Sequence, residues 1–176
     1  MGIDPGTNIM GFGLILCKDN QISLIQMNVL KLNKLTDHAL KLKKIFDTTC
    51  SIIDQYHPDE LAIEAPFYGK NVQSMLKLGR AQGVAIAAAL SRELTINEYT
   101  PRKIKQSITG NGSASKEQVA GMLSTILNFN DIPKYLDETD AVAVAVCHFF
   151  QNKNASTDEK FTGWKAFLNK NPDRLG

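Results

Sequence analysis

The sequence predicts an α/β domain in which helices flank a five-stranded mixed sheet. Three β-rich runs follow one another at residues 1–4, 9–17 and 22–32, with only short polar breaks, which favours an antiparallel meander of three strands. Helical and β-rich segments then alternate, which is typical of crossover connections that add strands to the same sheet. The expected element order is βββαβαβααα.

The first three strands are separated by turn-forming residues. Pro5 and Gly6 follow the short buried strand 1–4 and supply the fixed and the permissive backbone angles that a tight turn needs. The polar stretch 18–21 separates the second strand from the third. These breaks are short enough for neighbouring strands to pair directly.

Two helix–strand units follow the meander. Apolar positions recur at helical spacing across residues 37–56, with Thr36 or Asp37 available as the cap, and Pro58 ends that helix. Residues 60–64 then form a strand suited to the centre of the sheet, because it arrives by a crossover. A helix over about 72–91 leads to a fifth strand at 94–99.

Three further helices are predicted at residues 101–108, 116–127 and 137–151, separated by breaks at 110–112 and 130–135. One domain therefore covers residues 1–151. The polar tail 152–176 contains one short stretch with an amphipathic pattern. Its apolar members are Phe161, Trp164, Phe167 and Leu168.

Composition limits the class of protein. The chain has 176 residues, of which 43% are hydrophobic and 22% charged, enough for one globular domain but not for two of ordinary size. Its cysteines, Cys17, Cys50 and Cys147, form no CxxC pair, which argues against a zinc site or a disulfide framework and favours a reducing, cytoplasmic setting. The longest apolar run, 84–90, is too short to span a bilayer.

The distribution of charge indicates a nucleic-acid partner more clearly than the net charge of +2 does. No acidic residue occurs between Ala65 and Arg92, or between Tyr99 and Lys116, although both windows contain several lysines and arginines. Both windows can therefore form basic surface of the kind that binds phosphates.

Four carboxylates are candidates for chemistry because of their positions. Asp4 lies in the first strand and Glu64 ends the fourth, so the two become neighbours if these strands pair side by side. Asp137 and Asp140 open the last helix and share one of its faces, because residues three apart are neighbours there. Taken singly, each has an ordinary alternative as a turn residue, a helix cap or a surface charge.

Converging carboxylates repel one another unless cations neutralise them. Oxygen ligands select hard divalent ions, so the sequence predicts Mg²⁺, with Mn²⁺ as a plausible substitute. Two such ions about 3.5–4 Å apart can activate water and stabilise the leaving oxygen in phosphodiester hydrolysis. The sequence therefore favours a metal-dependent nuclease.

Eight short blocks of the chain form a specific pattern: GIDPGT at 2–7, GFG at 11–13, AIEAPF at 62–67, KN at 70–71, LKLG at 76–79, GVA at 83–85, GSASK at 112–116 and DETDA at 137–141. With these blocks in this order and spacing, the sequence resembles the RuvC family of Holliday-junction resolvases over residues 1–151. Family members usually carry several more apolar residues before Gly2, where this chain has only Met1. We therefore expect a short first strand.

The resemblance implies an RNase H-like fold and a homodimeric crossover junction endodeoxyribonuclease. Such an enzyme resolves four-way DNA junctions by symmetric nicking in recombination and repair, and it works with the branch-migration proteins RuvA and RuvB. By position, the metal-binding catalytic residues are Asp4, Glu64, Asp137 and Asp140. The DNA-binding residues that the resemblance implies are Phe67, which stacks on unpaired bases, and Lys70, Lys105 and Lys116.

Two other functions fit parts of the sequence. Residues 2–7 alone fit the phosphate loop of actin-like or sugar-kinase-like nucleotide-binding proteins, but those need two similar domains, and this length does not supply them. A catalytically silent nucleic-acid-binding module on the same fold is the second alternative. Loss of a carboxylate would indicate such a module, and all four are present.

Overall fold

The computed structural model describes residues 1–66, 71–129 and 136–157. Its sheet has five strands in the order β3-β2-β1-β4-β5, and β1 pairs antiparallel with β2 but parallel with β4. β3 is antiparallel to β2, and β5 is parallel to β4. The predicted meander and the two crossover strands are therefore confirmed. The strands are β1 (Gly2–Asp4), β2 (Ile9–Lys18), β3 (Gln21–Lys31), β4 (Glu60–Glu64) and β5 (Thr95–Tyr99).

The helices follow the predicted order, and polar side chains cap the first four. They are α1 (His38–Tyr56), α2 (Val72–Leu90), α3 (Pro101–Thr109), α4 (Lys116–Leu127) and α5 (Leu136–Thr157). The caps are Asp37, Asn71, Thr100 and Ser115, whose side chains accept backbone N–H groups of the first turn.

Helix α5 runs to Thr157, so the predicted end at Gln151 was too early. The residues after Gln151 are polar and give no apolar periodicity, but extending a formed helix costs little compared with starting one. The amphipathic stretch predicted in the tail lies outside the described residues.

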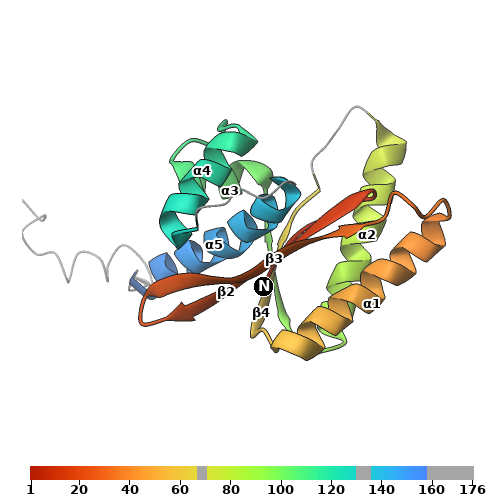
Figure 1. The fold of residues 1–176 in the computed structure, drawn as a ribbon, viewed down its shortest axis with the longest axis horizontal. Coiled ribbons are helices and arrows are strands. Elements are labelled where there is room, and N and C mark those ends of the chain that lie inside the picture. Colours follow the sequence, from red (N-terminus) through yellow and green to blue (C-terminus); the bar gives the residue numbers. More distant parts are fainter. Residues whose placement is uncertain (67–70, 130–135, 158–176) are drawn as a thin grey trace, which may run out of the picture.

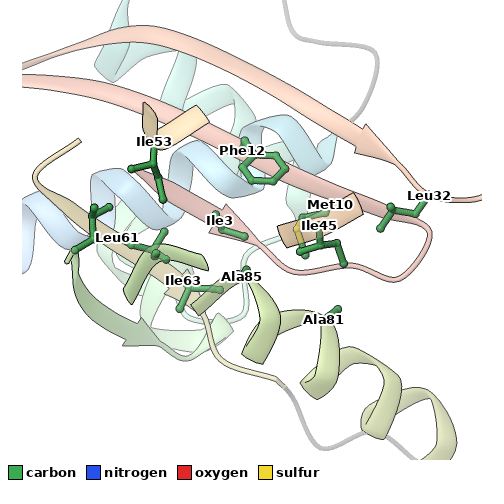
Figure 2. Close-up of a cluster of buried hydrophobic side chains, with 12 residues drawn as sticks. Ile3, Met10, Phe12, Leu32, Ile45, Ile53, Leu61, Ile63, Ala81 and Ala85 are labelled. Atoms are coloured by element: carbon green, nitrogen blue, oxygen red, sulfur yellow. The ribbon is translucent and has the colours of Figure 1, made fainter. Parts of the chain in front are cut away.

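The two faces of the sheet carry different helices (Figure 1). Helices α1 and α2 lie on one side, and α3, α4 and α5 on the other. On the first side, Ile3 of β1 and Ile63 of β4 are fully buried against Ile45 of α1 and Ala85 of α2, as Figure 2 shows. A second buried cluster, which includes Leu123 and Val142, packs on the opposite face. Burial on both faces is what a central parallel pair requires.

Strand β1 is short, and hydrogen bonds to β4 fix the position of its first residues. The backbone N–H of Ala62 donates to the carbonyl of Met1 at 2.8 Å, and the amino group of Met1 donates to the carbonyl of Glu60 at 2.9 Å. The parallel pairing therefore starts at the first residue. It fixes how far β1 reaches along β4, and hence where Asp4 lies.

The described residues contain no helix both long and apolar enough to cross a bilayer. The cysteines are free; Cys17 is exposed, whereas Cys50 and Cys147 are buried.

Candidate metal centre

The neighbouring ends of β1 and β4 bring the first two carboxylates together. The register pairs Gly2 with Ala62 and Ile3 with Ile63, so Asp4 and Glu64 are the next residues on adjacent parallel strands. The sequence predicted this arrangement, because a crossover strand beside the first strand ends at the same edge of the sheet.

Three glycines let α5 lie unusually close to the sheet. A Cβ atom on Gly11 of β2 would lie 2.0 Å from the backbone oxygen of Asp137, and one on Gly2 would lie 2.2 Å from that of Ala141. A Cβ on Gly13 would lie 2.7 Å from the backbone nitrogen of Val142. Only hydrogen fits in these positions. The first turns of α5 are therefore held against β1 and β2.

This packing places the two helical carboxylates beside the strand-end pair. Ligand oxygens of Asp4, Asp137 and Asp140 all lie within 4.8 Å of one another. Glu64 is outside this group of three but lines the same cavity of about 280 Å³, together with Asp4 and Asp140. We call the four residues Asp4, Glu64, Asp137 and Asp140 the carboxylate centre.

Two of the predicted DNA-binding lysines reach the same cavity. Lys105 of α3 and Lys116, the first residue of α4, both line it. The ammonium group of Lys116 forms an ion pair with Asp140 and lies 3.9 Å from Oδ1 of Asp137. Phe67 and Lys70 lie outside the described residues.

The carboxylate centre is electrostatically frustrated when no metal is bound. Burial, and then the neighbouring charges of Glu64 and Asp140, raise the pKa of Asp4 well above its ordinary value. Burial and the charge of Asp140 raise the pKa of Glu64 to about 7. Burial also raises the pKa of Asp140, against the opposing effect of Lys116. These shifts mean that the folded protein disfavours the charged forms.

The donor set fits a hard divalent cation. Carboxylate oxygens are the ligands such ions prefer, and a cation would remove the repulsion that raises these pKa values. One cation, the Lys116 ammonium, already lies among the oxygens. The centre can therefore hold divalent metal between Asp4, Asp137 and Asp140, with Glu64 at its edge.

Residues that the sequence did not single out support the centre. Lys41 of α1 donates to the carbonyl of Thr7 at 2.9 Å and to Oδ1 of Asn8 at 3.2 Å, which holds the turn that follows Asp4. Gln82 of α2 is buried and donates to the carbonyl of Glu64 at 3.3 Å and to Glu98 at 2.8 Å. The sequence offered one signal for the role of Gln82, namely a glutamine on the buried face of an Ala-rich helix. Buried polar groups need hydrogen-bond partners, so such a residue is expected to hold another polar group in place.

We expect the metal-free protein to lose stability as the pH rises. The folded-state pKa of Glu64 is raised from its ordinary 4.5 to about 7. The contribution of Glu64 to the free energy of unfolding is therefore fully present below about pH 4.5 and is lost as the pH rises through 7. The loss amounts to about 3 kcal/mol. Asp4 shifts in the same direction. Urea unfolding in chelator between about pH 5 and 8 measures this.

Glu64→Gln is the control for this prediction, because it cannot titrate and should flatten much of the decline. Saturating Mg²⁺ should also flatten it, since metal binds the deprotonated form. A wild-type profile equal to that of Glu64→Gln would contradict the assigned environment of Glu64.

Comparison with known proteins gives one consistent result. The RuvC family of crossover junction endodeoxyribonucleases matches residues 1–148. The chain is 61% identical to the RuvC protein of Cytophaga hutchinsonii over 99% of its own length and 86% of the relative's. It is also 61% identical to that of Christiangramia forsetii, over 99% and 91%. The structure of T. thermophilus RuvC in complex with a Holliday junction substrate superposes with a TM-score of 0.81 at 28% identity, covering 88% of this chain and 94% of that one.

Proposed function

Since the chain belongs to the RuvC family of crossover junction endodeoxyribonucleases, we propose that it resolves four-way (Holliday) junctions by metal-dependent nicking at the carboxylate centre. The observation that carries this assignment is the convergence of Asp4, Asp137 and Asp140, whose oxygens lie within 4.8 Å of one another. These residues come from one strand, β1, and one helix, α5, of the matched region. We propose that the catalytic domain comprises residues 1–151, followed by the polar tail 152–176, of which residues 152–157 continue α5.

Divalent metal use follows from the family and fits the donor set. We propose Mg²⁺ as the ion, two per site, with Mn²⁺ as a substitute. Asp4, Asp137 and Asp140 hold the metal, and Glu64 completes the site. Bound divalent ions supply activation of water and charge stabilisation of the leaving oxygen in phosphodiester hydrolysis.

The protein's own side chains orient the substrate at this site. Lys105 and Lys116 line the cavity and supply positive charge for the phosphates of the strand to be cut. The family resemblance assigns two more contacts, a phosphate to Lys70 and stacking of an unpaired base to Phe67.

A synthetic four-way junction incubated with the protein and Mg²⁺ tests the proposed function. We expect paired nicks at symmetric positions in two opposed strands, no nicks in chelator, and no comparable cutting of a linear duplex of the same sequence. Tight junction binding without nicks would instead indicate a catalytically silent binding module. ATP binding without DNA binding would indicate the nucleotide-binding alternative.

Replacing Lys116 and Phe67 should change junction binding in different ways. If Lys116 contacts one phosphate, Lys116→Ala should lower the slope of log affinity against log salt by about one. Phe67→Ala should weaken binding or cutting by about 1–3 kcal/mol with the slope unchanged, because stacking depends little on salt. Fluorescence anisotropy in chelator at several salt concentrations measures both.

Lys43→Ala is the matched control for the salt slope. It removes the same charge from α1, where Lys43 pairs with Asp47 on the surface. We expect its slope to match the wild type. Equal slope changes in the Lys116 and Phe67 variants would remove the distinction between phosphate contact and stacking.

Two opposed nicks require two catalytic centres, so we propose that the protein is a homodimer. Helix α2 offers the surface for a second copy, because it presents an exposed apolar stripe and contains no acidic residue. The stripe comprises Val72, Leu76, Gly83, Ala87 and Leu90. RuvA and RuvB are the partners that the family resemblance implies, and we propose a cytoplasmic location, where the free cysteines stay reduced.

A charge on the α2 stripe should separate the proposed dimer. Leu76→Asp places a carboxylate in the middle of the stripe, where burying it unpaired is costly. We expect sedimentation velocity to show a monomer. Leu40→Asp on α1 is the control, because Leu40 is 53% and Leu76 50% exposed, and it should leave the wild-type state unchanged. A dimer that persists in Leu76→Asp would exclude this surface.

A further inference from the structure

The ammonium group of Lys116 lies among the carboxylates assigned to the metal. It forms an ion pair with Asp140 and lies 3.9 Å from Oδ1 of Asp137, and both carboxylates belong to the group within 4.8 Å that includes Asp4. The side chain of Asp140 is only 14% exposed, so solvent screens its charge little. Among the described residues, Lys116 is the cation that pairs with this charge.

The backbone of Lys116 is fixed, although its side chain is long and flexible. Ser115 caps α4 in a reciprocal capping box with Gln118, which places Lys116 at the first helical position. Four methylene groups separate this anchored backbone from the ammonium. The charge can therefore move by several ångströms without any change in the helix.

Lys116 and a divalent ion cannot use the same oxygen of Asp140 at the same time. The ammonium donates hydrogen bonds to the lone pairs that would coordinate the metal. In a partly buried site, its positive charge would also be strongly repelled by a divalent ion at this distance. Lys105 differs from Lys116, because no hydrogen bond joins it to a carboxylate within the described residues, although both lysines line the cavity.

We propose that Lys116 competes with divalent metal for the carboxylate centre in the free protein and transfers its ammonium to a DNA phosphate when substrate binds. This inference rests on the proposed function, since it takes the carboxylate centre as the metal site. Lys116 then has two alternative anionic partners, Asp140 without DNA and a phosphate with it. DNA binding and metal loading become coupled, and each raises the affinity for the other.

Metal binding by the DNA-free protein tests this competition without any measurement of activity. The probe is Mn²⁺, followed by titration calorimetry and by the electron paramagnetic resonance of the free ion. Removing the competitor in Lys116→Met should tighten Mn²⁺ binding at least about fivefold, the lower end of typical coupling between two ligands. Lys116→Arg keeps the positive charge and should bind Mn²⁺ with nearly wild-type affinity.

Two controls separate competition from a general change of charge. Lys43→Met removes a surface charge and should leave Mn²⁺ affinity unchanged. Lys105→Met removes a charge from the same cavity without breaking an ion pair with Asp140. It should therefore raise the Mn²⁺ affinity clearly less than Lys116→Met does. Equal tightening in the two cavity variants would overturn the specific competition by Lys116.

The remaining outcomes distinguish this inference from the proposed metal site. Suppose that the wild type binds Mn²⁺, that Asp140→Asn does not, and that Lys116→Met binds it no more tightly than the wild type. This result overturns the competition and leaves the metal site intact. Failure of both the wild type and Lys116→Met to bind Mn²⁺ overturns the metal site, and the competition with it. Circular dichroism of each variant establishes that it is folded, and Lys116→Gln serves as a second neutral variant.

Discussion

Asp140→Asn is expected to bind four-way junctions with at least wild-type affinity and to nick them at least about 100-fold more slowly. Loss of residues that merely orient metal ligands already costs about 10–100-fold in metal affinity or activity, and a direct ligand should cost more. Asparagine keeps the shape of the side chain but not the charge that the centre needs. Junction binding persists because basic residues position the DNA, and removing a negative charge weakens no phosphate contact.

Single-turnover nicking in Mg²⁺ and anisotropy in chelator measure the two properties separately. Asp47→Asn is the control, because Asp47 carries the same group on the surface of α1, paired with Lys43. That variant should nick at the wild-type rate. Failure of folded Asp140→Asn to bind junctions, or nicking at the wild-type rate, would contradict the role given to Asp140.

Gly11→Ala is expected to lower the free energy of unfolding by about 3 kcal/mol or more. The new Cβ would lie 2.0 Å from the backbone oxygen of Asp137 and 2.9 Å from its carbonyl carbon. Backbone atoms cannot rotate away, so α5 must move by about 1.5 Å to restore ordinary contact. Because α5 carries Asp137 and Asp140, a displacement of this size should also slow nicking by about 100-fold.

Urea unfolding with Gly121→Ala as the control measures the stability effect. Gly121 lies inside α4, and a Cβ there would meet nothing within 4 Å. That substitution should raise the unfolding free energy by about 0.5–1 kcal/mol, because alanine is the better helix former. Similar changes in the two variants would show that the contact between β2 and α5 is not as close as described.

The sequence predicted the parts of the site that depend on local spacing or on strand order. Asp137 and Asp140 share a helix face because they are three residues apart, and Asp4 meets Glu64 because parallel strands end at one edge. It could not predict the ion pair between Lys116 and Asp140. These residues are 24 positions apart, and their contact depends on how α4 packs against α5.

Two other features were beyond sequence reasoning for similar reasons. The glycines of β1 and β2 were recognisable as a motif, but their purpose appears only when the backbone of α5 is found against them. The end of α5 at Thr157 was missed because residues after Gln151 carry no apolar pattern, although the helix continues through them.

The contact between α5 and the glycines makes the spacing of the carboxylates independent of most of the interior. Elsewhere in the protein, the depth of a helix depends on the volumes of the side chains beneath it, so exchanges among Val, Leu and Ile shift it by small steps. At Gly2, Gly11 and Gly13, α5 instead lies directly on the backbone of the strands, so side-chain volume elsewhere has less influence on its distance from β1 and β2. The positions of Asp137 and Asp140 should therefore tolerate interior substitutions better than a contact made through side chains would.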